Sequence, residues 1–321
     1  MQTRQQLYAQ ALRQVQSRRQ KAVTLATRTM ERAREEIPGL DALLRRQALA
    51  EAAAGRARLV GGPDEAKAAQ DAAAQVRAQL EQALSQAGIR PGDLQPAYTC
   101  PLCKDKGEYE GKTCRCVHLE ARALRRRELS RISALELSRF DTFELDRYPD
   151  RFVPEYNCNP RENMAEILNY CKDYARRFST RNPSLLMTGT AGLGKTHLAL
   201  AIAGEVLERG ADVIYLTART FFDQMEREKY APESDLSRVV QEAELLVLDD
   251  LGTEFVTNYT VSALYELVNT RMLRRLPTIY TTNIQKEDVL RARYTEKTAS
   301  RLLGSCEVLD FYGTDQRRRE K

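Results

Sequence analysis

The sequence has no tryptophan, only 7% aromatic residues, and no apolar run that approaches the ~18–20 residues of a membrane span. The missing tryptophan excludes nothing, but the missing apolar run argues against a membrane protein. The N-terminus is basic and helical in pattern, without the hydrophobic core of a secretory signal. With 30% charged residues and a net charge of +5, the surface is expected to be highly solvated. We therefore expect a cytoplasmic protein without a membrane partner, in which 321 residues leave room for two or three units.

A glycine-rich stretch at residues 189–196 matches the phosphate-binding spacing G-x-x-x-x-G-K-T. Its glycines let the backbone curl so that N–H groups face phosphate oxygens, and the helix starting at Gly194 adds the positive end of its dipole. Lys195 can reach the β- and γ-phosphates, and the Thr196 hydroxyl can bind Mg²⁺. Because an apolar run precedes the stretch and a helical run follows it, we expect ATP to bind here. The expected nucleotide contacts are Gly189, Thr190, Ala191, Gly192, Leu193, Gly194, Lys195, Thr196 and His197.

From Ser184 onward, short apolar runs alternate with helical stretches, which is typical of an α/β fold with a parallel sheet. In such a fold the ligand binds beyond the carboxyl ends of the strands. The five predicted strands are 184–188, 212–216, 245–249, 278–282 and 306–311.

Polar side chains follow two of these strands. The third strand ends in Asp249 and Asp250, of which Asp249 is expected to hold Mg²⁺, directly or through water, and Asp250 to orient the attacking water. Asn283 follows the fourth strand, where it can hydrogen-bond the γ-phosphate or the water. Asn283 also fits the N-cap of a helix at 285–291, and the two roles can coexist.

The N-terminal region reads as helices separated by Pro38-Gly39 and by Gly61-Gly62-Pro63. In the third stretch small residues recur in a strict 3-4 alternation, which favours close coiled-coil-like packing. We expect a helical hairpin or a three-helix bundle. The first helix is basic, which indicates a solvated face or a surface for a partner protein. Direct nucleic-acid contact is the weaker alternative, because no aromatic residues lie between the charges.

Four of the seven cysteines crowd into the pattern C-x₂-C-x₁₀-C-x-C. A nucleotide-binding protein of the cytosol keeps its thiols reduced, so the cluster indicates a metal site rather than disulfides. Four thiolates leave Zn²⁺ no open position, which is typical of a structural site. The expected ligands are Cys100, Cys103, Cys114 and Cys116, with His118 as an alternative to either of the last two.

The phosphate-binding stretch resembles that of the AAA+ ATPases, as do the run 245–250 followed by Leu251-Gly252 and the pair Thr282-Asn283. Within that class the sequence is similar to the DnaC/DnaI-type replicative helicase loaders. The Asp249–Gly252 run, the Ser300-Arg301-Leu302 run and the cysteine-rich module carry this narrower resemblance.

The resemblance implies a first-sensor role for Asn283 and an arginine-finger role for Arg301, which would reach the γ-phosphate of a neighbouring subunit. The protein would then be a homo-oligomer that binds single-stranded DNA through the segment 221–243 and loads a hexameric replicative helicase. Two departures matter. Most AAA+ proteins have Glu where this chain has Asp250, so hydrolysis is expected to be slow. Only a short basic tail, 317–321, remains near the end, so no C-terminal lid is expected.

The expected organisation is a helical domain at 1–95 for helicase contact, a zinc module at 96–120, a basic helical linker at 121–160 and the AAA+ domain at 161–321. Two other functions stay open. One is a transposition helper ATPase of the IstB type, which shares the core and binds duplex DNA as a filament. The other is an ATP-gated adaptor that hydrolyses little. An origin in a phage or mobile element also fits.

Overall fold

The structure is a computed structural model that describes residues 2–133, 138–230 and 236–316. The basic tail at 317–321, part of the expected linker and part of the expected DNA-binding segment lie outside these residues. The described chain divides into two compact units, one of residues 12–117 and one that joins residues 1–11 to residues 118–321. None of the helices in the described ranges is both long and apolar enough to cross a bilayer.

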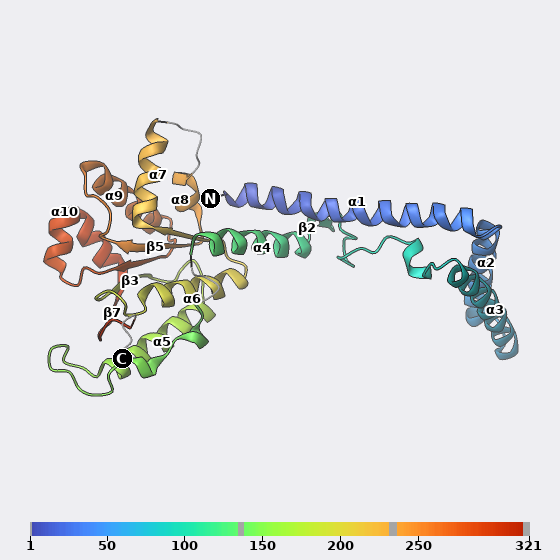
Figure 1. Ribbon diagram of the computed structural model, residues 1–321, viewed down its shortest axis with the longest axis horizontal. Coiled ribbons are helices and arrows are strands. Elements are labelled where there is room, and N and C mark those ends of the chain that lie inside the picture. Colours follow the sequence, from blue (N-terminus) through green and yellow to red (C-terminus); the bar gives the residue numbers. More distant parts are fainter. Residues whose placement is uncertain (1, 134–137, 231–235, 317–321) are drawn as a thin grey trace. The chain divides into compact units, whose positions relative to one another are not determined.

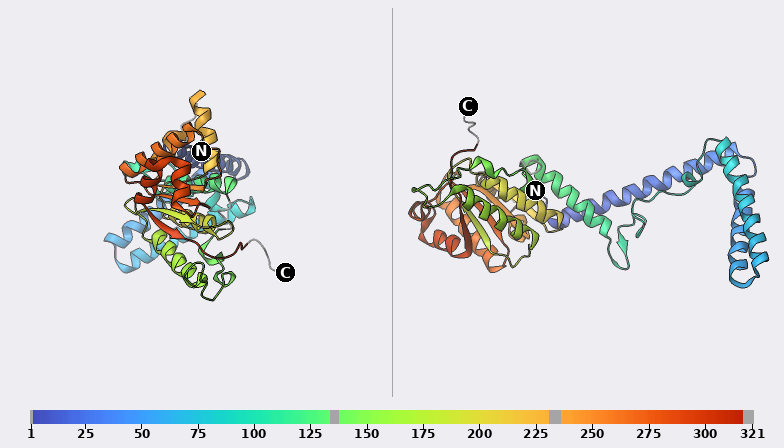
Figure 2. Two further views of the ribbon diagram at one scale, coloured as in Figure 1. Left: turned by 90° about the vertical axis from the view of Figure 1, so that its left-hand side faces the viewer. Right: turned by 90° about the horizontal axis from the view of Figure 1, so that it is seen from below.

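The N-terminal region is helical, as predicted. It comprises α1 (Arg4–Glu36), α2 (Leu40–Val60) and α3 (Pro63–Gln86), with Pro63 in the first turn of its helix. Gly39 takes a left-handed φ of 79°, which turns the chain between the first two helices. Helices α2 and α3 lie side by side and antiparallel (Figures 1 and 2).

Of the two predicted arrangements, the structure therefore has the hairpin. The last turns of α1 meet it in a small apolar cluster. The buried residues of this cluster are Ala33, Ile37, Leu40, Leu80, Leu84 and Ile89.

A short hairpin follows, made of β1 (Glu108–Tyr109) and β2 (Lys112–Thr113), and then α4 (Arg115–Ile132). The 3₁₀ turn η1 (Pro91–Leu94) precedes this hairpin, and two further 3₁₀ turns follow α4, η2 (Phe140–Thr142) and η3 (Leu145–Arg147). The α/β domain then begins with α5 (Pro160–Arg176), whose N-cap Asn159 accepts a hydrogen bond from the backbone N–H of Arg161.

The α/β domain contains the predicted five-stranded parallel sheet, with strand order β4-β5-β6-β3-β7. Each observed strand begins within one residue of its predicted start, because each apolar run is short and bounded by turn residues. The strands are β3 (Ser184–Thr188), β4 (Val213–Thr217), β5 (Leu245–Leu251), β6 (Thr278–Thr282) and β7 (Cys306–Asp310). The helices between them are α6 (Lys195–Glu208), α7 (Ala218–Tyr230), α8 (Leu236–Glu242), α9 (Asn258–Leu273) and α10 (Glu287–Ser305).

Helices cover both faces of the sheet, and alternate strand residues enter two separate cores. Leu185 and Met187 of β3 pack with α5 and α6, whereas Leu186 between them packs with α7 to α10. The fold is therefore a three-layer α/β sandwich in which the carboxyl ends of all five parallel strands lie at one edge of the sheet.

The basic helix α4 is tied to this domain by Arg125, which is only 1% exposed. Its guanidinium donates to the Asp212 carboxylate at 3.0 and 3.1 Å, to Glu128 at 2.6 Å and to the Gln2 carbonyl at 3.0 Å. Burial raises the pKa of Asp212, and the Arg125 charge acts in the opposite direction. One arginine thus joins the start of α1, α4 and the turn before β4.

Candidate functional site

The phosphate-binding loop lies between β3 and α6, at the carboxyl edge of the sheet. Its three glycines have positive φ values of 144° at Gly189, 79° at Gly192 and 81° at Gly194. A Cβ on Gly194 would lie 2.7 Å from the Phe143 ring, and one on Gly189 would lie 2.5 Å from the Phe311 carbonyl oxygen. Both the backbone conformation and the surrounding space therefore require glycine here.

The Lys195 side chain is 95% buried in this loop, since only 5% of its surface is exposed. Its ammonium donates to the carbonyl oxygens of Gly189 at 2.7 Å and Thr190 at 2.6 Å, and to Asn283 Oδ1 at 2.9 Å. The first two bonds hold the lysine against its own loop. The third bond brings Asn283, the residue after β6, to the head of the phosphate loop. A terminal phosphate bound there would need both Lys195 and Asn283.

Three hydroxyl groups hold the Asp249 carboxylate behind this point. Oδ1 accepts from Thr196 Oγ1 at 2.9 Å and from Thr281 Oγ1 at 2.6 Å, and Oδ2 accepts from the Tyr215 hydroxyl at 2.8 Å. Burial, with the Asp249 charge added to it, raises the pKa of Tyr215, so the phenol stays a donor. A carboxylate and a threonine hydroxyl in contact are hard oxygen ligands of the kind that Mg²⁺ prefers.

Asp250 reaches the cavity because the strand is irregular at this point. The pairing of β5 with β6 shifts between Leu248 and Leu251, and Asp250 takes a left-handed φ of 58°. Its backbone N–H donates to Thr281 Oγ1 at 2.8 Å. In a regular strand neighbouring side chains point to opposite faces, so the irregularity allows two consecutive aspartates to serve one site.

A cavity of about 490 Å³ opens in front of these groups. It brings together eight of the predicted site residues. These are Ala191, Gly192, Gly194, Lys195, Thr196, His197, Asp250 and Asn283. Leu193 instead points into the core, and Asp249 lies behind Thr196. Asn283 does not cap a helix, because α10 begins at Glu287 with Lys286 as its N-cap.

Sequence reasoning missed one wall of this cavity, which the segment 142–148 forms. Thr142, Phe143, Glu144, Arg147 and Tyr148 line it, although this stretch was predicted only as part of the basic helical linker at 121–160. The Tyr148 hydroxyl donates to the Leu193 carbonyl at 2.9 Å, and the Phe143 ring meets the His197 ring edge-on at 5.5 Å. The Phe143 ring, which is only partly buried, offers an apolar surface on which a flat base can pack. Gln316 and Thr253 were also missed.

Arg301 does not line the cavity of its own chain. It lies on α10 beyond an interruption at Thr295, where φ is 71°. The guanidinium donates to Asn269 Oδ1 and lies 4.9 Å from the centre of the Tyr265 ring. Lys297 shares that ring, at 4.7 Å. The segment 221–243, expected to contact DNA, includes most of α7 and all of α8, and Phe221 and Phe222 are buried in the core.

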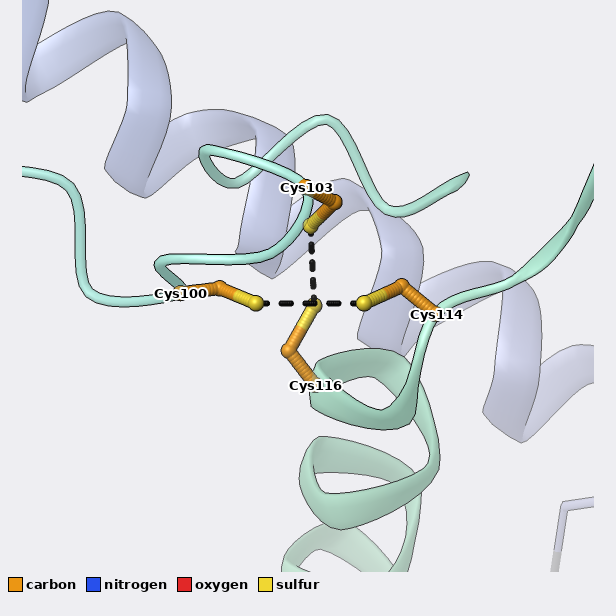
Figure 3. Close-up of side chains that lie close together, drawn as sticks. All are labelled: Cys100, Cys103, Cys114 and Cys116. Atoms are coloured by element: carbon orange, nitrogen blue, oxygen red, sulfur yellow. Dashed lines mark hydrogen bonds between the residues drawn. The ribbon is translucent and has the colours of Figure 1, made fainter. Parts of the chain in front are cut away.

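The four clustered cysteines lie together (Figure 3), and all four sulfur atoms are within 4.8 Å of one another. The Cys100 and Cys114 sulfur atoms are 3.8 Å apart, and those of Cys103 and Cys116 are 3.4 Å apart. For comparison, a tetrahedral site with Zn–S bonds of about 2.3 Å places its sulfur atoms about 3.8 Å from one another. The Gly107 N–H donates to Cys103 Sγ at 3.4 Å, and the Asp105 carboxylate accepts from the backbone N–H groups of Thr99 and Cys100.

The donor set thus fits a soft, four-coordinate metal ion. The His118 ring is bonded through Nδ1 to the Tyr8 hydroxyl at 2.8 Å, and the group of four thiols forms without it.

A phosphate loop, a parallel sheet of this order and an acidic pair near the carboxyl end of β5 define an ATP-binding domain of the P-loop class. Residues 163–321 match the family described as IstB-like ATP binding protein. The chain therefore carries a domain of the IstB/DnaC family.

The replicative helicase loader DnaC of Escherichia coli (strain K12) is 28% identical over 131 residues, which cover 40% of this chain and 54% of that protein. The phage-like element PBSX protein XkdC of Bacillus subtilis (strain 168) is 26% identical over 224 residues, or 65% of this chain and 80% of that protein. The chain spans about half the length of the DnaC proteins that it matches. A crystal structure of the DnaC helicase loader is 20% identical, has a TM-score of 0.48 and covers 56% of this chain and 99% of that one.

Proposed function

We propose that this protein is a cytoplasmic ATP-dependent loader of a replicative DNA helicase. The observation that carries the proposal is the meeting of Lys195, Asp250 and Asn283 in one cavity of a domain that belongs to the IstB/DnaC family. ATP would bind with its phosphates along residues 189–196 and be hydrolysed to ADP and phosphate. Thr196 and Asp249 would hold Mg²⁺, which neutralises charge on the phosphates.

The chain's own groups divide the reaction between them. Lys195 would exchange its bond to Asn283 for phosphate oxygens, and the freed Asn283 amide would then contact the γ-phosphate or the water. Asp250 would orient and polarise that water, but aspartate is one methylene shorter than the usual glutamate, so we expect slow turnover. A neighbouring copy would contribute Arg301, so the active form would be a homo-oligomer.

ATP would act as a switch in this protein. While the γ-phosphate is present it ties Asn283 and the neighbour's Arg301 together, and hydrolysis releases both. The N-terminal helices and the cysteine module would contact a hexameric helicase. The segment 221–243 would contact single-stranded DNA, as the resemblance to helicase loaders implies.

Co-purification with the host's replicative helicase tests this function. We expect the tagged full-length protein to retain the helicase when ATP is present and to lose it with the Lys195→Ala variant or with ADP. Failure to retain helicase under any nucleotide condition, while ATP binding is normal, would contradict loading but not the ATP site.

The family description favours a second candidate, a transposition helper of the IstB type. That candidate predicts retention of a transposase instead of a helicase, and ATP-dependent binding of duplex rather than single-stranded DNA. The helical hairpin and the cysteine cluster favour the loader, since such helpers usually lack them. Parallel retention assays with both partners distinguish the two.

We also infer that the cysteine cluster holds a structural Zn²⁺. Metal analysis of the purified protein is then expected to give about one zinc per chain, and Cys103→Ser to lower this ratio strongly, because serine replaces one thiolate of a four-ligand site. ATP affinity should not change, since the cluster lies in the other compact unit. Cys171→Ser serves as the control, because that buried thiol belongs to the core. A zinc content that is unaffected by Cys103→Ser would contradict the assignment.

A further inference from the structure

A second cavity of about 360 Å³ lies at the opposite edge of the sheet from the phosphate loop. The first residues of β3 and β6, Ser184 and Thr278, open onto it. The turn before β3, the end of α9 and the end of α10 complete its wall. Because the two cavities lie at opposite ends of the strands, this one plays no part in the nucleotide site described above.

The lining of this cavity has positive charge and no negative charge. Three arginines face it, Arg181, Arg271 and Arg275, and none of its lining residues is an aspartate or glutamate. Within the described ranges, none of the three arginines forms an ion pair with a carboxylate. Several other arginines of the same domain do have one, as Arg176 has with Asp173 and Arg238 with Glu242.

Arg271 is the deepest of the three and is 1% exposed. All of its recorded acceptors are neutral: Thr278 Oγ1 at 2.7 Å and the carbonyl oxygens of Val240 at 2.6 Å, Ala243 at 2.9 Å and Pro277 at 2.7 Å. Burial lowers the pKa of Arg271 to about 10, which leaves the group charged at neutral pH. A buried charge is normally balanced by an opposite one, and an anion in the cavity would supply it.

The Ser184 hydroxyl adds an uncharged donor, whereas the fully buried Thr278 hydroxyl positions Arg271. Ser184 Oγ accepts from the Thr278 backbone N–H at 3.0 Å, and Thr278 Oγ1 accepts from Arg271 Nε at 2.7 Å. A hydroxyl that accepts such a bond keeps its own hydrogen to donate. Donors therefore come from one strand, a helix end and a turn, a spread that suits a tetrahedral oxyanion better than a planar carboxylate.

Arg275 occupies a position that usually belongs to glycine. Helix α9 ends in a Schellman motif, in which the Arg275 N–H donates to the Met272 carbonyl at 3.1 Å and the Leu276 N–H to the Arg271 carbonyl at 3.0 Å. The residue in the left-handed position is Arg275, with φ of 54°. An arginine is kept there at a steric cost that glycine would not incur, and its side chain lines the cavity.

We propose that this cavity is a second anion site, which binds a phosphate group through Arg181, Arg271 and Arg275. The phosphate is either a free ion or part of the phosphodiester backbone of a nucleic acid, since both present the same oxygens. The proposal is independent of the nucleotide site and of the function proposed above.

The test uses full-length protein in a Lys195→Ala background, which removes phosphate binding at the nucleotide loop. The variant is Arg181→Gln/Arg275→Gln. The matched control is Arg177→Gln/Arg209→Gln, two exposed arginines that lose the same charge but do not line the cavity. Arg271 is left unchanged because it supports the fold.

The first probe is inorganic phosphate, added at constant ionic strength while the melting temperature is followed. The background protein and the control should be stabilised by phosphate relative to chloride, and the cavity variant should lose that difference. The second probe is a labelled oligo(dT) strand, titrated at several salt concentrations. Loss of two phosphate contacts should weaken binding about tenfold at moderate salt and reduce the salt slope by about 1.4.

The outcomes distinguish a phosphodiester backbone from a free phosphate ion as the ligand. Loss of both effects identifies a phosphodiester ligand, and loss of the phosphate effect alone identifies a free phosphate. Equal behaviour of the cavity variant and the control with both probes overturns the proposal. If phosphate has no effect but a polyglutamate peptide binds the background protein and not the variant, the site takes an acidic peptide and the phosphate assignment is wrong. Absence of any DNA binding by this protein would count against the loader function, not against the cavity.

Discussion

Replacement of Lys195 by alanine is expected to abolish measurable ATP binding. Its ammonium is the cation at the head of the phosphate loop, and its present acceptors are two loop carbonyls and the Asn283 amide, which a phosphate can replace. Removing one partner of a buried charge pair costs about 2–5 kcal/mol, which corresponds to a loss of affinity of roughly 30- to 4,000-fold. Equilibrium titration with a fluorescent ATP analogue measures this directly.

Lys286→Ala is the control for this experiment. Lys286 is exposed at the N-cap of α10 and does not line the cavity, so the same loss of charge there should leave ATP affinity unchanged. An unfolded variant would be recognised by its circular dichroism spectrum. A folded Lys195→Ala protein that binds ATP as tightly as the unmodified protein would remove the assignment of residues 189–196.

The α/β core could be predicted from sequence because its signals are local. The runs at 184–188 and 245–249 are mostly apolar, and the run at 278–282 consists of β-branched and aromatic residues. All three are short, and residues 189–196 carry glycines that few other loops require. The carboxyl ends of parallel strands share one edge, so the meeting of Lys195 with Asn283 follows from the order of elements.

The features that could not be predicted depend on distant contacts. Nothing local indicates the shift in strand pairing at Asp250, because it arises from how β5 pairs with β6. The wall at 142–148 reaches the cavity only because the Tyr148 hydroxyl is bonded to the Leu193 carbonyl, 45 residues away. The sequence predicted the region of Arg125 only as a basic helical linker, yet this arginine is buried against Asp212.

The arginine-lined cavity at the opposite edge of the sheet could not be predicted either, because it too depends on distant contacts. Arg181 and Arg275 are far apart in sequence, and only the closeness of the turn before β3 to the end of α9 brings them together. Sequence reasoning also left the N-terminal helices open between a hairpin and a bundle. An alanine-rich seam specifies that helices pack closely, but not how many of them do so.

Arg301→Ala is expected to keep ATP binding and to lose most of the turnover that appears when the protein assembles. Because Arg301 does not line its own chain's cavity, its removal should leave Lys195 and the phosphate loop unaltered. An arginine supplied by a neighbour stabilises charge in the transition state and typically raises the hydrolysis rate by about 10³–10⁵-fold. Steady-state ATPase assays over a range of protein concentrations, with single-stranded DNA present, measure this contribution.

A merely structural role for Arg301 has to be distinguished from this one, because the guanidinium contacts Asn269 and the Tyr265 ring within its own chain. Lys297→Ala provides the matched control, since Lys297 lies 4.7 Å from the centre of the same ring. If the ring contacts alone matter, both variants should lose a similar fraction of turnover and of thermal stability. An arginine finger that acts on a neighbouring chain predicts a large loss of turnover for Arg301→Ala alone. It also predicts that mixing Arg301→Ala protein with Lys195→Ala protein restores activity, at interfaces where the intact loop of one chain meets the intact arginine of the other. Unchanged turnover of Arg301→Ala at high protein concentration would exclude the finger.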